Sequence, residues 1–178
     1  MKDLFTDRLY LRLRTPRRMA ECRTKDWDEL SAFFGTDSKE YLQKQLDIIE
    51  LGAENYSIRF CYWDILIRDT ETCIGNIGFF EWYFRHFKAE LGYWMHEEVN
   101  RNKGYISEAL TEVLEFGFND LNMHRIYART ALDNEPSKAV LKKFGFTEEG
   151  ISRQEYFSNN EFTDSLNFAL LKSEYKPR

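Results

Sequence analysis

The segment NRNKGYISEAL, residues 100–110, places two cationic side chains and a glycine directly before a stretch with helical character. Arg101, Lys103 and Gly104 stand where the first turn of that helix would begin. The N–H groups of a first turn lack intrahelical partners, the helix dipole adds positive potential, and glycine lets an anion approach the backbone. These residues therefore indicate a phosphate site, although a turn with solvated side chains fits the segment alone equally well.

This segment matches neither of the two best-known phosphate loops. The chain contains no GxxxxGK[ST] motif and no GxGxxG motif, so the fingerprints of nucleoside triphosphate and dinucleotide binding are absent. His86, His96 and His124 form no HxH or HxxE pattern. We therefore expect no bound metal ion.

The elements that must position this segment follow from the periodicity of apolar residues. Alternation over residues 9–14 predicts a strand with one buried face, and helical patterns follow in residues 26–35 and 38–52. An antiparallel meander of three strands comes next, then the helix after Gly104, and then a strand, a helix and two closing strands. These later elements are expected at residues 58–68, 72–83, 88–96, 106–121, 124–132, 136–144, 146–157 and 165–172.

Composition is that of a globular protein. The 178 residues are 43% hydrophobic and 31% charged, which suits one domain over residues 1–178. The net charge of -5 argues against a nucleic-acid partner, since phosphate contacts need clustered lysine and arginine. No apolar run approaches the roughly 20 residues of a membrane span, so we expect no membrane partner and a cytoplasmic location. Cys22, Cys61 and Cys73 lie among apolar neighbours and fit buried thiols in a reducing compartment.

A second segment, NEPSKAVLKKFGF at residues 134–146, has a local logic of its own. Asn134 or Glu135 can cap a helix, Pro136 suits its first turn, and Gly145 suits its C-terminal stop. Capping needs no ligand, so this helix alone indicates no function. Its place about 30 residues after the first segment is more specific than either segment by itself.

Together, residues 90–110, 122–146 and 165–175 resemble the GNAT superfamily of acyl-CoA-dependent N-acyltransferases. The likeness is strongest to the branch that includes the acetyltransferases of ribosomal-protein N-termini (RimJ/RimL-like), and residues 4–12 are similar to the first strand of that branch. The resemblance implies an α/β (α+β) fold with a central mixed, mostly antiparallel sheet flanked by helices. It also implies that strands at residues 90–95 and 125–132 splay apart to admit pantetheine.

In that family a Q/R-x-x-G-x-G/A loop cradles the pyrophosphate of coenzyme A at a helix start. Arg101 and Gly104 match it, and Ile106 replaces the usual small residue, as larger apolar residues also do in this branch. The second segment corresponds to a helix beside the pantetheine arm. The resemblance implies acetyl-CoA as cosubstrate and no metal, with contacts to coenzyme A from Met95, Arg101, Asn102, Lys103, Gly104, Tyr105, Ile106, Ser107, Asn134 and Ser137.

Acetyl transfer to nitrogen needs a neutral amine, a donor for the oxyanion and, in some enzymes, a proton for the leaving thiolate. An α-amino group with a pKa of about 7.7 to 8.0 is roughly a tenth neutral at pH 7, whereas a lysine near 10.4 is almost wholly charged. An N-terminal or weakly basic small amine therefore needs only modest help.

The resemblance makes Glu90 the first candidate for that help, because it begins the strand beside the thioester and could take the proton directly or through water. The alternative is a solvated glutamate or one paired with Lys88 or Arg85. Glu81 is the second candidate. Strict alternation places it on one face with Phe79 and Tyr83, and places Phe80 and Trp82 on the other.

Ser137 is the third catalytic candidate. Many relatives place a tyrosine seven residues after the motif asparagine to protonate the sulfur, but Leu141 holds that position here. The resemblance implies that the Ser137 hydroxyl lies near the sulfur instead, unless it only bonds the backbone of its first turn. A thiol with a pKa of about 8.5 can also leave without a dedicated acid.

Two functions from different classes follow. The first is an N-acetyltransferase that moves acetyl from acetyl-CoA to a primary amine by direct attack in a ternary complex. The acceptor is a peptide N-terminus or a small-molecule amine, and a homodimer is the assembly common in the family. The second is an acyl-CoA-binding regulatory module without catalysis, and Glu90, Glu81 and Ser137 favour the enzyme.

Overall fold

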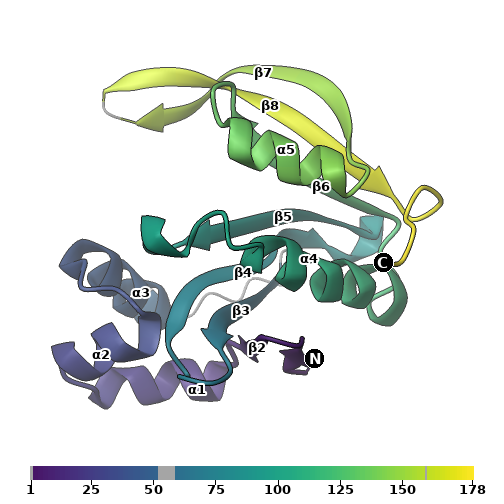
Figure 1. Ribbon diagram of the computed structural model, residues 1–178. Helices are drawn as coiled ribbons and strands as arrows, with labels where there is room; N and C mark the ends of the chain where they lie inside the picture. The colour runs from purple at the N-terminus through teal and green to yellow at the C-terminus, as the bar shows by residue number, and fades with distance from the viewer. Residues whose placement is uncertain (1, 52–58, 159) are drawn as a thin grey trace.

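A single sheet organises the protein, whose computed structural model describes residues 2–51, 59–158 and 160–178 (Figure 1). Within these ranges its eight strands follow the order β1-β2-β3-β4-β5-β6-β8-β7, and β5 with β6 is the one parallel pair among these neighbours. The expected mixed, mostly antiparallel sheet is confirmed. The strands are β1 (Leu4–Phe5), β2 (Leu9–Leu13), β3 (Arg59–Ile67), β4 (Cys73–Tyr83), β5 (Lys88–Met95), β6 (Arg125–Ala131), β7 (Thr147–Ser158) and β8 (Glu161–Leu171).

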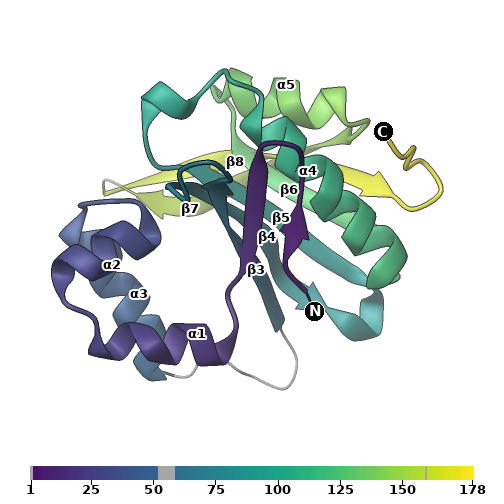
Figure 2. The ribbon, with the colours of Figure 1, turned by 60° about the horizontal axis from the view of Figure 1, so that its bottom comes forward.

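The described residues form five α-helices, which flank this sheet in two groups. The first group, α1 to α3, lies on one side, and α4 and α5 lie on the other (Figures 1 and 2). None of the described helices has the length and apolar character needed to cross a membrane. The helices are α1 (Pro16–Glu21), α2 (Trp27–Phe34), α3 (Lys39–Leu51), α4 (Tyr105–Glu115) and α5 (Glu135–Lys143).

Local signals explain most helix boundaries. Asp26 and Glu29 form a capping box at the start of α2, and Gly35, at a φ of 69°, ends it. The long helix expected after Gly104 is regular only to Glu115, and a π-helical turn over Phe116–Asp120 completes it. The predicted elements at residues 38–52 and 58–68 are found as α3 and β3, but positions 52 and 58 lie outside the described residues.

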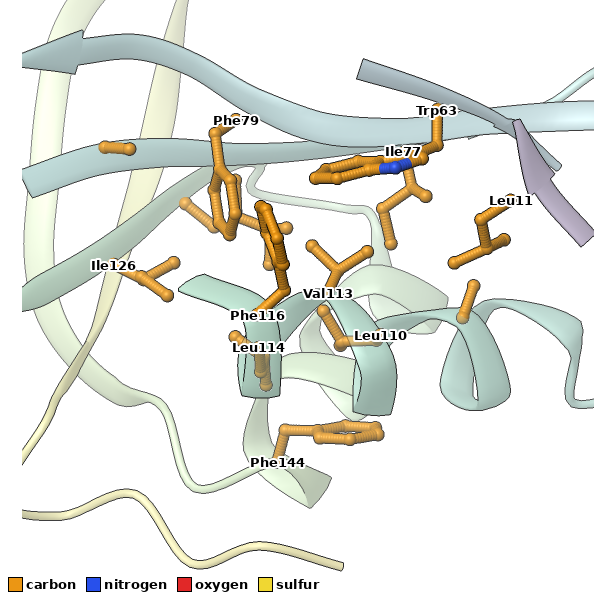
Figure 3. Close-up of a cluster of buried hydrophobic side chains, with 14 of the residues drawn as sticks. Leu11, Trp63, Ile77, Phe79, Leu110, Val113, Leu114, Phe116, Ile126 and Phe144 are labelled. Carbon is orange, nitrogen blue, oxygen red and sulfur yellow. The ribbon is translucent and has the colours of Figure 1, made fainter. Parts of the chain in front are cut away.

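The main hydrophobic core lies between the sheet and the pair α4 and α5 (Figure 3). Alternate side chains of the strands point into it, and α4 contributes the residues expected from its helical stripe. The buried set includes Leu11, Trp63, Ile77, Phe79, Leu110, Val113, Leu114, Phe116, Ile126 and Phe144. A smaller core beneath α1 to α3 contains Cys22, Leu30, Phe34 and Leu42.

All three cysteines are buried and free, as predicted. Burial raises the pKa of the Cys61 and Cys73 thiols to about 12, so both stay protonated near neutral pH.

The sheet splits between its two parallel strands. Lys88, Ala89 and Glu90 of β5 pair with residues 125–127 of β6, and no further pairs follow along these two strands. Figure 1 shows β6, β8 and α5 diverging from β5 beyond that point. The expected splay is therefore confirmed, and beyond it one edge of each strand has no strand partner among the described residues.

A bulge interrupts β4 at its C-terminal end. The register of β4 with β5 shifts between Phe80 and Tyr83, where β4 has one extra residue, and Glu81 adopts a φ of 41°. Trp82 packs against the main core together with Phe79, whereas the Glu81 carboxylate bonds side chains on the opposite face. The expected strict alternation is wrong, because the bulge changes the phase of the strand.

Candidate active site

The N-terminus of α4 has the geometry of an anion site. Gly104 precedes the helix at a φ of 79°, and Asn102 also adopts a left-handed conformation at 60°. No side chain caps the first turn. A Cβ placed on Gly104 would meet only a nitrogen of Arg8, at 3.6 Å. The conformation favours glycine, and the position of the missing Cβ is open apart from the Arg8 guanidinium.

Arg8, which sequence reasoning missed as a site residue, lies at this helix start. Its Nη1 donates to the carbonyl of Lys103 at 3.2 Å, and its guanidinium lies 4.8 Å from the ring centre of Tyr105. Glu108 binds the same guanidinium, with 2.6 Å between Nη2 and Oε2. The turn between β1 and β2 brings Arg8 to the start of α4, and no local sequence pattern predicts this contact.

Further charges surround the loop. Although burial opposes ionisation, hydrogen bonds from Thr6 and Arg8 lower the pKa of Glu108, which keeps it as the anionic partner of Arg8. Lys143 of α5 reaches the first turn of α4, where its Nζ lies 3.4 Å from the Ser107 hydroxyl. Arg101 forms an exposed ion pair with Glu98 at 3.3 Å. Two cations from separate elements, Arg8 and Lys143, thus lie at one helix start.

The apolar residues of the predicted loop turn inward. Tyr105 and Ile106 pack against the main core, which explains how a large side chain replaces the usual small one without blocking the loop. Met95, at the end of β5, is 8% exposed and belongs to the same core. Its side chain faces away from solvent, and its backbone is what it can offer to a ligand.

The second segment forms α5 as predicted. The Asn134 side chain accepts a hydrogen bond from the Ser137 N–H at 3.1 Å, so Asn134 rather than Glu135 caps the helix. Gly145 follows the helix at a φ of 86°. The Ser137 hydroxyl lies 2.8 Å from the phenol oxygen of Tyr93 on β5. This contact, also missed from the sequence, links the two sides of the split.

An arginine and three carboxylates form a second cluster, on the sheet face opposite α4 and α5. Arg129 of β6 binds both oxygens of Glu90, with 3.0 Å between Nε and Oε1 and a second bond from Nη2 to Oε2. Its other contacts are Glu155 at 2.5 Å and Glu81 at 3.4 Å. The Tyr127 hydroxyl donates to Glu81 at 2.9 Å. The structure therefore brings Glu81 and Glu90 together.

This cluster sets the electrostatics of the open face. Hydrogen bonding to Glu90 raises the pKa of Arg129, against the opposing effect of burial, so the guanidinium stays charged. Burial, and then the hydrogen bond to Glu81, raise the pKa of the Tyr127 phenol. The Glu90 side chain is 15% exposed and that of Glu81 is 42% exposed. Both can act on a water or an amine at this face, and Glu81 is the more accessible.

The partner of Glu90 differs from the two that the sequence suggested. Arg129 pairs with it, whereas Lys88 lies over the rings of Tyr83 and Tyr127. Alternation along residues 125–131 places Tyr127 and Arg129 on one face, but only the pairing of β5 with β6 shows that Glu90 shares it. Within the described ranges, no group of three His, Cys, Asp or Glu side chains is arranged to hold a metal ion.

Comparison with known proteins supplies the family. A model of the Acetyltransferase (GNAT) domain matches residues 8–147. The uncharacterized N-acetyltransferase YoaA of Bacillus subtilis (strain 168) is 35% identical over 173 residues, which cover 95% of this chain and 96% of YoaA.

Two solved structures share the fold. A chimera of the Vibrio cholerae spermidine N-acetyltransferase SpeG and hSSAT matches with a TM-score of 0.73 at 20% identity, over 97% of this chain and 100% of the other. The ribosomal-protein-S5-alanine acetyltransferase of Vibrio fischeri gives 0.71 at 22% identity, over 99% and 100%. The family model covers well over half of the chain and YoaA nearly all of it, so the protein belongs to the GNAT family and is an acetyltransferase.

Proposed function

We propose that this enzyme transfers acetyl from acetyl-CoA to a primary amine by direct attack in a ternary complex. The observation that carries the proposal is the split after Glu90, with carboxylates on one side of it and the Ser137 hydroxyl on the other. GNAT domains use acetyl-CoA. Membership of an acetyltransferase family favours an enzyme over a binding module without catalysis.

The start of α4 would hold the pyrophosphate of acetyl-CoA. The open first-turn N–H groups, the left-handed Gly104 and the nearby cations suit a doubly charged group. Arg101, Asn102, Lys103 and Ser107 lie next to this helix start in the sequence and would contact the pyrophosphate. Tyr105 and Ile106 pack against the core and support it. The pantetheine arm would then run into the split beside Asn134 and Ser137, where the free edges of β5 and β6 can bond its amides.

The carboxylate cluster would serve the attacking amine. Glu90 is the first candidate for proton acceptance, and because Arg129 occupies both of its oxygens, we infer that a water relays the proton. Glu81 is the second candidate and is more exposed. Ser137 would lie near the sulfur. Three carboxylates around one arginine leave an excess of negative charge, which suits an acceptor that arrives as a cation.

The proposed acceptor is a small amine or a protein N-terminus. Solved structures of the same fold carry names for a spermidine enzyme and for a ribosomal-protein enzyme, so both a small amine and a protein N-terminus fit. We favour the RimJ/RimL-like branch because of its sequence pattern, and we predict a cytoplasmic location and a homodimer. A thiol-release assay with acetyl-CoA against N-terminal peptides, polyamines and amine antibiotics tests the acceptor directly.

The donor site has its own test. Saturating acetyl-CoA, at about 100 times its Kd, should stabilise the fold by roughly 2.7 kcal/mol, which corresponds to a melting-temperature rise of about 5 to 10 °C. Gly104→Glu should abolish this rise by placing bulk and negative charge against the pyrophosphate. Gly150→Glu is a matched control, because Gly150 also has a positive φ, at 131°, and a Cβ placed on it would meet no atom within 4 Å. An undiminished rise in Gly104→Glu would remove the phosphate assignment.

A further inference from the structure

A hydrogen bond between two hydroxyl groups joins β5 to α5 across the split in the sheet. The phenol oxygen of Tyr93 lies 2.8 Å from Ser137 Oγ and 3.5 Å from the Ser137 carbonyl oxygen. Tyr93 is three residues beyond Glu90, the last residue of β5 that pairs with β6. Its ring packs against the main core, and the Asn134 cap fixes the backbone of Ser137. Both hydroxyl groups are therefore held in place by their surroundings.

The reaction creates a need for a donor at this position. When the amine nitrogen bonds the acetyl carbon, the C–S bond breaks and its electron pair leaves on the sulfur of coenzyme A. A neutral amine loses one proton from its nitrogen as the amide forms, and the thiolate of coenzyme A takes up one proton to become the thiol, so these two transfers balance. An amine that arrives as a cation first gives up one further proton on the carboxylate side. Leu141, at the position where many relatives carry a tyrosine, is 1% exposed within the core and has no donor to offer.

We propose that Tyr93 is a positioning residue, which donates its hydrogen to Ser137 Oγ and so directs the Ser137 hydroxyl hydrogen toward the leaving sulfur. This inference rests on the proposed function, because it assigns a part of the same site. A serine hydroxyl has one hydrogen, and a bond received from Tyr93 leaves that hydrogen available to the sulfur. Burial raises the pKa of the Tyr93 phenol, so the phenol keeps its proton near neutral pH.

The arrangement separates proton removal from proton supply. Glu90 and Tyr93 lie about 10 Å apart along β5, at roughly 3.3 Å per residue, and their odd spacing places them on opposite faces. Glu90 joins Arg129 on the open face, whereas Tyr93 joins Ser137 beside α5. A thioester in the split would have its attacking amine on one side and its sulfur donor on the other.

The test is a double-mutant cycle of Tyr93→Phe and Ser137→Ala, measured at saturating acetyl-CoA with an acceptor from the amine panel. Ser137→Ala removes a hydrogen bond to a charged group and should lower kcat about 30-fold, and Tyr93→Phe should lower it about 10-fold. The double variant should match Ser137→Ala, with KM for acetyl-CoA within about twofold of wild type. Tyr175→Phe is the matched control, because its phenol bonds Glu115, outside the split, at 3.0 Å.

A binding measurement gives a second readout that does not depend on catalysis. A donor to sulfur stabilises the thiolate of free coenzyme A, so wild type should gain affinity over both variants as the pH rises past the thiol pKa of about 8.5. Additive losses in the cycle, a Tyr93→Phe loss larger than that of Ser137→Ala, or equal pH profiles of coenzyme A binding would overturn the assignment. Wild type that binds no acetyl-CoA would instead refute the proposed function.

Discussion

Two ionic clusters lie on the same face of the sheet and have opposite excess charge. On β2 and β3, Asp64 is shared by Arg12 at 3.1 Å and Arg14 at 2.7 Å. On β5 and β6, Arg129 is shared by three glutamates. The first cluster has more cation than anion, and the second has more anion than cation.

The two clusters also differ in how much of their side chains is exposed to solvent. The Asp64 side chain is 1% exposed, and Arg14 also bonds Gln45 and Tyr41 of α3. Arg12 lies 3.9 Å from the ring centre of Phe33 of α2. Helices pack over this cluster, whereas in the cluster at the split the Glu81 side chain is 42% exposed. The same pairing chemistry thus holds helices against the sheet in one place and leaves the Glu81 carboxylate partly exposed in the other.

The largest effect should come from the closed cluster. Asp64→Asn removes a buried carboxylate and leaves Arg12 and Arg14, whose side chains are 18% and 10% exposed, without their counter-charge. Breaking a pair with a buried partner in this way costs about 3 to 5 kcal/mol of unfolding free energy. Urea unfolding measures the loss, which also predicts a melting temperature lower by about 10 °C. Glu40→Gln, which removes the exposed pair with Lys44, is the control and should change little. Equal stability of Asp64→Asn and wild type would mean that the two clusters do not differ in this way.

In contrast to Asp64→Asn, Glu90→Gln should lower activity strongly and change stability little. It keeps the shape of the side chain but removes its basicity, so kcat should fall about 100-fold and the acidic limb of the pH–rate profile should move. Its unfolding free energy should change by less than about 1 kcal/mol, because Glu155 and Glu81 still neutralise Arg129. Glu149→Gln, which weakens the neighbouring pair with Arg125, controls for the loss of an ion pair. Wild-type activity of Glu90→Gln across the pH range would remove Glu90 from the mechanism.

The smallest expected effect is a pH dependence of the unfolding free energy. A hydrogen bond from Ser165, and then the bond from Arg129, lower the pKa of Glu155 below its ordinary value of 4.5. Its ionised form therefore stabilises the fold above that value, and the contribution disappears as the pH falls and the group is protonated. Wild type should exceed Glu155→Gln by less than about 1 kcal/mol at pH 7, and the difference should shrink at pH 4. A gap in urea unfolding that does not depend on pH would contradict this origin.

Most helices and strands could be predicted from residues that are close together in the sequence. The glycine before α4, the asparagine cap of α5 and the meander of β3 to β5 were predictable because each depends on residues close in sequence. The short helix α1 was not predicted, because its six residues are too few for a periodic stripe, although Thr15 caps it.

The site was predictable only in part. The sequence pointed to Glu90, Glu81 and Ser137, but their partners Arg129, Tyr127 and Tyr93 come from elements 39 to 48 residues away along the chain. Such contacts depend on the register between strands and on the splay of the sheet, which no local pattern specifies. Arg8 was missed for the same reason, since a turn near the N-terminus carries it to α4.

The bulge in β4 has a consequence for how this protein can change over generations. Phe79 and Trp82 lie on the core face, and Phe80 and Tyr83 lie on the opposite face. The extra residue of the bulge is therefore Glu81, which stands between Phe80 and Trp82. Deleting that one codon would restore regular alternation without moving a neighbour to the wrong face. The carboxylate at position 81 is thus a removable insertion, which a lineage could gain or discard in one step while keeping the sheet.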